Sequence, residues 1–447
     1  MMQRVLSVAL ALSSFSQLTT AYRPGDEVCV VSADNACPLD KLTPSKVDSS
    51  TLIYPGGKTR CAFDDFKDPV TGFSTNATYF FQVFPTEKKD KSKLMLYLQG
   101  GGACVDDDTC SFGLQCSLQH NATFLMSATA SSAGVLNRTD TNNVFKDWNI
   151  VNVPYCTGDV HIGNREGGVH EPAAAASLGQ PQCLDNNMTV HFNGFENVNA
   201  VFKWALENFP DPEHIVLSGS SAGALAAQFY SKMIAKAWKI QEKKIKYTII
   251  SDSYVGVAPD SNPIARTVNF FNACGLDYGL PDDVVKKCEA NKATVVGTVA
   301  PLVKDTLFSD WLFIDSNADI TQRVFYQVFQ DGLAGFPFNN PLSPEAFYAN
   351  MTSILDTYEA ISSRIATFTV NSSNHMYFDR PTWYSTPGIE SNKMGAIVGD
   401  VLAGKYASGS QATAGDSAST SGVPSLAPSV VATSGVISTI LGLIFAL

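Results

Sequence analysis

The 447-residue sequence lacks an excess of basic side chains: 31 lysines and arginines stand against 42 aspartates and glutamates, a formal net charge of −11. Attraction to the phosphate backbone supplies most of the affinity of nonspecific nucleic-acid binding, and an acidic chain has no such attraction to offer. We therefore expect no nucleic-acid partner.

Zinc-site spacing is also missing, because none of the ten cysteines stands in a CxxC…CxxC pattern. The spacing therefore gives no support to a cysteine zinc site of this kind. An even number of cysteines fits disulfide pairing in an oxidising compartment, and the closest candidates are Cys29 with Cys37 and Cys274 with Cys288. Six glycosylation triplets agree with secretion: Asn76, Asn121, Asn137, Asn187, Asn350 and Asn371.

The apolar run at the start is too short to span a bilayer, since it covers only Val5 to Leu12. Arg4 before it and a small-residue cleavage site ending at Ala21 predict a signal peptide over 1–21. The end of the chain has a Ser/Ala/Gly-rich stretch over 404–429 and an apolar tail over 430–447. Small residues, a spacer and an apolar terminus without basic residues predict a flexible stalk and a GPI-attachment signal, and a tail anchor is the alternative.

Apolar runs alternate with helical patterns through the middle of the chain. Strands are predicted over 77–84, 94–98, 148–155, 215–217, 247–250, 311–314 and 365–370, and helices over 193–209 and from 222 to about 238. This alternation predicts an α/β fold over 22–403, with a mainly parallel sheet flanked by helices. Residues 22–90, with three cysteines, read as an N-terminal extension stapled to this domain. No internal repeats occur.

The segment from His214 to Tyr230 combines a short apolar strand, a Gly-x-Ser-x-Gly turn and an Ala-rich helix. This layout is typical of a nucleophile elbow, in which a serine stands on a sharp strand-to-helix turn. Ser221 is the candidate nucleophile, and the backbone N–H of Ala222 faces the position where an oxyanion would form.

Histidine is scarce, with six in the chain, and His375 alone follows Ser221. In an α/β-hydrolase the order is serine, acid, histidine, so His375 is the candidate general base. The acid is less constrained, because Asp252, Asp310, Asp315 and Asp319 all stand at or after predicted strand ends. Placement after the strand over 311–314 favours Asp315 or Asp319 without choosing between them.

A triple glycine, Gly100-Gly101-Gly102, follows the first strong strand. Consecutive glycines let a backbone approach a substrate closely and point N–H groups toward it. Together with Ala222, this loop is a candidate oxyanion hole.

Six ordered motifs now resemble the pectin acetylesterase/Notum family of secreted serine esterases. They are Leu98 to Cys104, Tyr155 to Asp159, Gly219 to Gly223, Ser251 to Ser253, Asn317 to Gln322 and Asn371 to His375. The resemblance covers roughly Leu94 to Tyr384. It implies an α/β-hydrolase-like fold and removal of O-linked acyl groups without a metal or an organic cofactor. By position it implies Ser221 as nucleophile, His375 as base, Asp319 as acid and Gly101, Gly102 and Ala222 as the oxyanion hole. Asp252 matches a structural position.

Two departures from the family pattern stand beside the glycine loop. Gln99 replaces a glutamate, and Ala103 stands where the plant enzymes carry a tryptophan, which should reshape the acyl or sugar subsite. We expect a secreted, surface-anchored monomer that removes acetyl groups from a cell-wall polysaccharide such as pectin. The alternatives are a Notum-like deacylase that removes a longer acyl chain from a protein and a non-catalytic surface binding protein.

Overall fold

The fold is taken from a computed structural model that describes residues 24–67, 74–110, 127–166, 169–170, 188–259, 261–336 and 338–405. The predicted signal peptide, nearly all of the stalk and the apolar tail lie outside these residues, as do Cys116, Cys183, Asn121 and Asn187. Within the described ranges, no helix is both long enough and apolar enough to cross a membrane.

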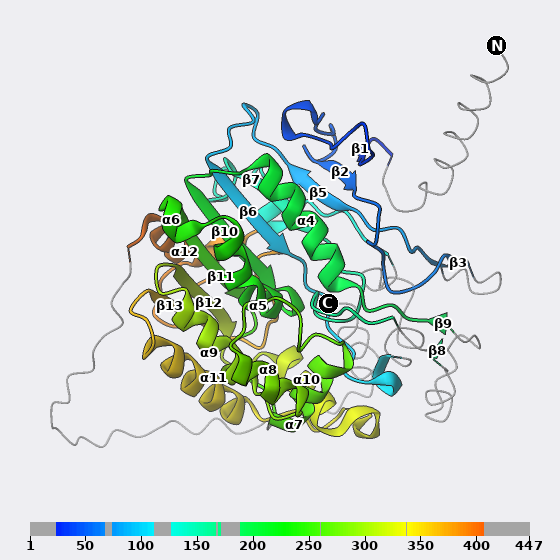
Figure 1. The fold of residues 1–447 in the computed structure, drawn as a ribbon. Coiled ribbons are helices and arrows are strands. Elements are labelled where there is room, and N and C mark those ends of the chain that lie inside the picture. Colours follow the sequence, from blue (N-terminus) through cyan, green and yellow to red (C-terminus); the bar gives the residue numbers. More distant parts are fainter. Residues whose placement is uncertain are drawn as a thin grey trace, which may run out of the picture.

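A nine-stranded sheet forms the centre of the molecule (Figure 1), with the order β1-β2-β5-β7-β6-β10-β11-β12-β13. Its strands are β1 (Glu27–Val30), β2 (Thr51–Tyr54), β5 (Phe81–Phe84), β6 (Lys93–Leu98), β7 (Asn149–Val153), β10 (His214–Ser220), β11 (Lys246–Asp252), β12 (Asp310–Ser316) and β13 (Ile365–Val370). Only β5 runs against its neighbours, and every other pair in this sheet is parallel. Two short hairpins complete the described strands: β3 (Phe66–Lys67) with β4 (Ser74–Thr75), and β8 (Val169–His170) with β9 (Met188–Thr189).

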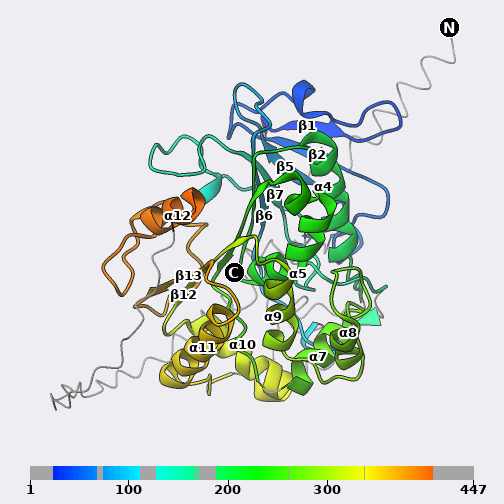
Figure 2. The same cartoon turned by 60° about the vertical axis from the view of Figure 1, so that its left-hand side comes forward.

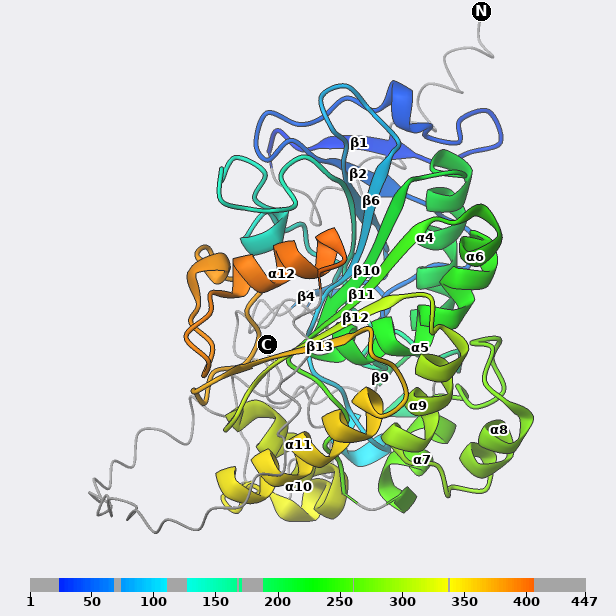
Figure 3. The ribbon, with the colours of Figure 1, turned by 90° about the vertical axis from the view of Figure 1, so that its left-hand side faces the viewer.

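Helices cover both faces of this sheet, as Figures 2 and 3 show from two further directions. The helices are α4 (Gly194–Asn208), α5 (Ala222–Ala237), α6 (Ile240–Lys243), α7 (Ser261–Phe270), α8 (Asp282–Glu289), α9 (Val295–Asp305), α10 (Ile320–Asp331), α11 (Pro344–Glu359) and α12 (Met394–Ala403). In Figure 3, α12 lies on one face of the sheet, and α4, α5 and α9 lie on the other. The predicted α/β class, with its mainly parallel sheet, is thereby confirmed.

The central strands are buried on both faces, which explains why their sequences are continuous apolar runs rather than alternating ones. All seven residues of β10 and all seven of β12 are buried. One apolar cluster fills the space between the sheet and the α4/α5/α9 layer, and a second, which includes Phe378, Trp383 and Val398, joins α12 to the opposite face.

The N-terminal stretch contributes directly to the sheet, since β1, β2 and β5 all lie within residues 22–90. Four disulfides join described cysteines. The predicted pairs Cys29–Cys37 and Cys274–Cys288 are confirmed, and the other bridges are Cys61–Cys156 and Cys104–Cys110. Cys61–Cys156 ties the N-terminal stretch to the loop that follows β7. Disulfides of this number fit a secreted protein.

The chain changes direction across the sheet at β6. It adds β7 on one side of β6 and later returns to place β10 on the other side. In open parallel sheets, ligands bind outside the carboxyl ends of the strands at such a switch point. The loop after β6 is the triple glycine, and the turn after β10 carries Ser221, so this crevice is where the candidate residues meet.

Candidate active site

Ser221 occupies the sharp turn between β10 and α5, with φ 54° and ψ −119°. Side-chain-bearing residues rarely adopt a positive φ, and such strain clusters at functional sites. The turn also requires two glycines. A Cβ at Gly219 would lie 2.2 Å from the Gly223 carbonyl oxygen, and one at Gly223 would lie 2.1 Å from the Leu98 carbonyl oxygen. The Ser221 N–H donates to the Asp252 carbonyl 2.8 Å away, which fixes the turn against β11.

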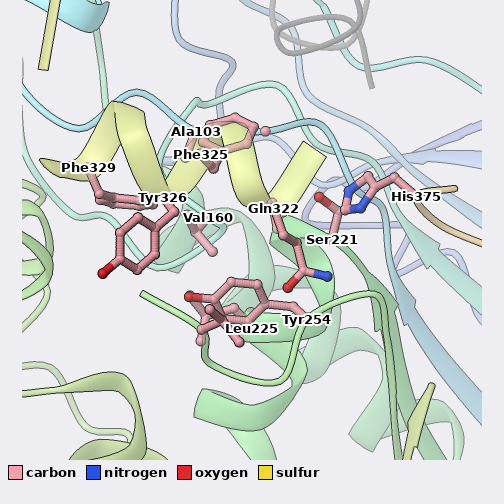
Figure 4. A pocket seen from close by; sticks show the side chains of 13 residues that line it. Ala103, Val160, Ser221, Leu225, Tyr254, Gln322, Phe325, Tyr326, Phe329 and His375 are labelled. Carbon is pink, nitrogen blue, oxygen red and sulfur yellow. The ribbon is translucent and has the colours of Figure 1, made fainter. Parts of the chain in front are cut away.

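His375 lies in the loop after β13, and its ring contacts the carboxylate of Asp319. The distance from His375 Nδ1 to Asp319 Oδ2 is 2.7 Å, and both side chains are buried. His375 Nε2 is also buried and has no hydrogen-bond partner among the described residues. Ser221 and His375 line the same pocket (Figure 4). Nε2 is therefore the ring nitrogen that is available to accept the proton of the Ser221 hydroxyl.

The charge of Asp319 changes the proton affinity of the His375 ring. Burial disfavours the imidazolium, but the charge of Asp319 and its hydrogen bond outweigh this, so the pKa of His375 is raised above its ordinary value of 6.5. The pair therefore stabilises a positively charged ring, as a general base requires once it has taken a proton.

Of the four candidate acids, all of them within the described residues, only Asp319 hydrogen-bonds to His375. Asp310 begins β12, at the opposite edge of the sheet from the crevice, and pairs with Arg364. Asp315, the other favoured candidate, is buried and accepts from the Gln322 side chain instead, with Nε2 at 2.8 and 3.0 Å from its two oxygens.

Asp252 connects the elbow to the histidine loop without contacting the ring. Its carboxylate accepts from the Ser220 hydroxyl at 2.6 Å and from the backbone N–H groups of Tyr377 and Phe378 at 3.0 and 2.9 Å. The Tyr97 hydroxyl lies 2.9 Å from Ser220 Oγ and extends this network to β6. Asp252 thus joins the strand before the glycine loop, the elbow and the loop of His375.

Asp319 has a second role as the N-cap of α10, because its Oδ1 accepts from the backbone N–H of Gln322 at 2.9 Å. The Gln322 side chain also donates to Asp319 Oδ2 at 3.0 Å. Gln322 therefore holds two buried carboxylates, those of Asp315 and Asp319, with one amide nitrogen. Burial and the charge of Asp319 keep the pKa of Asp315 well above its usual range. The sequence analysis did not predict this role of Gln322. The only signal for it was the spacing of three residues between Asp319 and Gln322.

The glycine loop packs against both the elbow and the histidine loop. A Cβ at Gly100 would lie 2.7 Å from Met376 Sδ and 2.8 Å from the Ser220 carbonyl oxygen. A Cβ at Gly101 would lie 2.4 Å from the ring of Tyr155, and Gly102 has a φ of +76°. Gly102 and Ala222 line the pocket with Ser221, whereas Gly101 packs against Tyr155 and is not among the lining residues.

Gln99 anchors this loop through three hydrogen bonds. Its N–H donates to Val153 at 3.1 Å, its Oε1 accepts from the Tyr155 N–H at 3.2 Å, and its carbonyl lies 2.8 Å from His161 Nε2. Burial lowers the pKa of His161 to about 4, so the ring is neutral at physiological pH and can donate to that carbonyl.

The pocket is narrow and mostly apolar, with a volume of about 50 Å³. One wall is a stripe on α10 at helical spacing, formed by Gln322, Phe325, Tyr326 and Phe329 (Figure 4). The remaining lining residues come from the glycine loop, the loop after β7, α5 and the loop after β11: Gly102, Ala103, Val160, Ser221, Ala222, Leu225, Tyr254 and Val257, with His375 closing one end. Ala103 thus borders the pocket, as its place next to the glycine loop implied.

A helix-flanked, mainly parallel sheet with a serine at a sharp strand-to-helix turn, and with a histidine–carboxylate pair at the same sheet edge, is an α/β-hydrolase-like arrangement. A profile of the Pectinacetylesterase family matches residues 74–323, more than half of the chain, and the protein belongs to this family. The match includes Ser221 and Asp319 and ends before His375.

Among curated proteins, the chain is similar to Pectin acetylesterase 11 of Arabidopsis thaliana. The two are 28% identical over 135 residues, which is 30% of this chain and 30% of the relative. The similar region thus spans less than one third of that relative.

Proposed function

We propose that this protein is a carbohydrate esterase that removes O-acetyl groups from a cell-wall polysaccharide such as pectin, with Ser221, His375 and Asp319 as its catalytic triad. The observation that carries the proposal is the buried His375, held by Asp319 at Nδ1 and unpartnered at Nε2, in one pocket with a serine on a strained turn. Membership of the Pectinacetylesterase family supports the choice of substrate class.

The proposed reaction has two halves. Ser221 Oγ attacks the acetyl carbonyl while His375 Nε2 takes the hydroxyl proton, and Asp319 stabilises the resulting imidazolium. The imidazolium then gives its proton to the departing sugar oxygen, which leaves an acetyl group on Ser221. Water attacks this acyl-enzyme, His375 takes one water proton, and acetate leaves as Ser221 regains its proton. Backbone N–H groups of Gly101, Gly102 and Ala222 are proposed to hold the oxyanion in both halves, each donor contributing roughly 3–4 kcal/mol at comparable sites.

The direct test is acetate release from acetylated pectin by the purified protein, compared with Ser221→Ala. We expect release by the wild type and a loss of at least about a thousandfold in the variant, because the nucleophile is absent. Ser353→Ala, at an exposed position of α11, is the matched control. A folded Ser221→Ala protein that retains full activity would overturn the triad. Absence of turnover by the folded wild type on every ester tested would instead favour the non-catalytic binding protein.

A second candidate function is removal of a longer acyl chain, and the apolar lining of the pocket favours it. Phe325, Tyr326 and Phe329 extend from the level of Gln322 over two turns of α10, about 10 Å at 1.5 Å per residue. An acetyl group needs far less apolar wall than this, whereas a longer chain would bury it.

A rate profile over p-nitrophenyl esters of increasing chain length separates the two functions. Highest kcat/KM for acetate supports the polysaccharide acetylesterase, and highest kcat/KM for a longer ester supports the second candidate. Leu225→Phe, which narrows the pocket one turn into α5 from Ala222, should reduce hydrolysis of long esters more than that of acetate.

We further infer from the sequence that the protein is secreted and held at the cell surface by a GPI anchor. The disulfides agree with secretion, and the small-residue stretch before the apolar tail carries the anchor proposal. A phosphatidylinositol-specific phospholipase should release the protein from membranes. Retention of the protein after that treatment, together with an intact C-terminal tail, would instead support a tail anchor.

A further inference from the structure

The Gln322 side chain leaves one polar atom unused at the candidate site. The residue is only 4% exposed. Its Oε1 is buried and has no hydrogen-bond partner among the described residues. Gln322 lines the pocket together with Ser221 and His375, and Figure 4 shows its amide end extending from α10 into the pocket. A buried acceptor without a donor is costly, so such an atom at a pocket wall points to a ligand.

The orientation of this amide is fixed by its other end. Gln322 Nε2 lies 3.0 Å from Asp319 Oδ2 and 2.8 and 3.0 Å from the two oxygens of Asp315. A carboxylate in the state that supports an imidazolium accepts hydrogen bonds and cannot donate one. Turning the amide over would place its oxygen against the Asp319 carboxylate, so the nitrogen must face Asp319 and the oxygen must face away.

Gln322 Oε1, which lies in the same pocket as Ser221 and His375, can only bind a group that donates a hydrogen bond. A carbonyl or ether oxygen of a substrate cannot satisfy it, and an aliphatic acyl group has nothing to donate. Among the species that the proposed reaction brings to this pocket, hydroxyl groups of the sugar and the attacking water can donate an O–H.

We propose that Gln322 Oε1 is a binding group for an O–H at the reacting ester, either a sugar hydroxyl next to the acylated oxygen or the water that hydrolyses the acyl-enzyme. This inference rests on the proposed esterase function and adds a specificity or water-positioning residue to it. With water as the donor, one water proton moves to His375 Nε2 and the other stays in the hydrogen bond to Gln322 as the oxygen attacks the acyl carbon. The bond from that carbon to Ser221 Oγ then breaks.

The test compares the wild type with Gln322→Met, which has a similar length and no hydrogen-bonding amide. Two sugar acetates serve as substrates, one with a free hydroxyl next to the ester and one with that hydroxyl replaced by hydrogen. If the sugar is the donor, the wild type prefers the hydroxylated acetate by about tenfold in kcat/KM, and Gln322→Met abolishes the preference. A purely structural role of Gln322 would lower both rates equally and leave their ratio unchanged.

The second arm uses p-nitrophenyl acetate, which has no sugar hydroxyl. If water is the donor, Gln322→Met lowers the deacylation rate about tenfold more than it lowers the acylation rate, so the variant shows a larger burst of nitrophenol than the wild type. Asp315→Asn is the matched control, because it disturbs the same cluster without removing Oε1.

The proposal is overturned if Gln322→Met leaves both the hydroxyl preference and the deacylation rate unchanged. It is equally overturned if Gln322→Met slows acylation and deacylation of every substrate by one common factor, as a purely structural disturbance would. Should Gln322→Met fail to fold, Gln322→Asn, which withdraws the amide by one methylene, is subjected to the same two arms. Absence of any Ser221-dependent ester hydrolysis by the wild type would instead contradict the proposed function itself.

Discussion

At the scale of single residues, two buried carboxylates compete for the role of the acid. Asp315 and Asp319 both contact the Gln322 amide, but only Asp319 reaches His375. We predict that Asp319→Asn lowers kcat by roughly 10³–10⁴, because an asparagine cannot stabilise the imidazolium or hold the correct tautomer. Asp315→Asn should lower it by less than about tenfold, since Asp315 contacts Gln322 and makes no hydrogen bond to His375. Steady-state kinetics on p-nitrophenyl acetate measure both losses of kcat. A larger loss in Asp315→Asn than in Asp319→Asn would identify Asp315 as the acid instead.

The pH dependence of the rate follows from the same pair. His375 must be neutral to accept the Ser221 proton, so kcat/KM falls toward acid as the ring becomes protonated. Because the pKa of His375 is raised, this acid limb should lie above the ordinary histidine value of 6.5. In Asp319→Asn the remaining activity should extend to lower pH, since the charge that favours the imidazolium is gone. Profiles of kcat/KM against pH for both proteins test this, and an acid limb that stays in place would contradict the assignment.

Ser221 and His375 could be predicted from the sequence because few other residues of the required type stand in the required place. One Gly-x-Ser-x-Gly turn stands in a strand-to-helix context, and one histidine follows it. The acid could not be chosen by position alone, because four aspartates stand near strand ends and the contact that distinguishes them joins loops 56 residues apart. The resemblance to a family pointed to Asp319, which is the one of the four that hydrogen-bonds to His375; its role as the acid stays a prediction. The free oxygen of Gln322 could not be predicted, since it depends on two carboxylates meeting one amide.

At the scale of elements, the elbow depends on glycine for space. We predict that Gly223→Ala destabilises the fold by about 3 kcal/mol, because its Cβ would meet the Leu98 carbonyl oxygen at 2.1 Å. Gly399→Ala on α12 is the matched control. Nothing lies within 4 Å of its added Cβ, and alanine in a helix interior should stabilise the protein by up to about 1 kcal/mol. Urea unfolding of the three proteins measures both effects, and equal stability of Gly223→Ala and the wild type would refute the packing argument.

Element prediction succeeded where strands carry a clear apolar run and failed where strands are short or where helices carry little pattern. The strands β6, β7, β10, β11 and β12 and the edge strand β13 were all predicted within a few residues, as were α4 and α5. β1 and β2 have four residues each and were missed, because their place in the sheet depends on pairing with distant partners. α10 was missed as well, since its N-cap Asp319 was considered only as an acid.

At the scale of the whole molecule, the disulfides differ in how much chain they constrain. Cys61–Cys156 closes a loop with a sequence separation of 95, and Cys29–Cys37 closes one with a separation of 8. In the chain-entropy description, the longer loop adds about 2 kcal/mol more stability than the shorter one. We predict that replacing the pair Cys61/Cys156 with alanine lowers the thermal midpoint clearly more than replacing the pair Cys29/Cys37. Differential scanning calorimetry compares them, and equal losses would show that loop length does not govern their contributions.

Because Asp319 contacts both α10 and His375, ligand binding in the pocket and protonation of His375 can influence each other. One carboxylate caps α10 and also holds the imidazole, while the aromatic stripe of the same helix forms a wall of the pocket. A compound that fills the pocket and a proton that charges His375 therefore act on one shared rigid element. Thermodynamic reciprocity then applies: if protonation changes the affinity for that compound by some factor, the compound must change the proton affinity of the ring by the same factor. Where such coupling exists, a compound seated only against the aromatic stripe shifts the proton affinity of His375 through α10, even when it does not touch the ring.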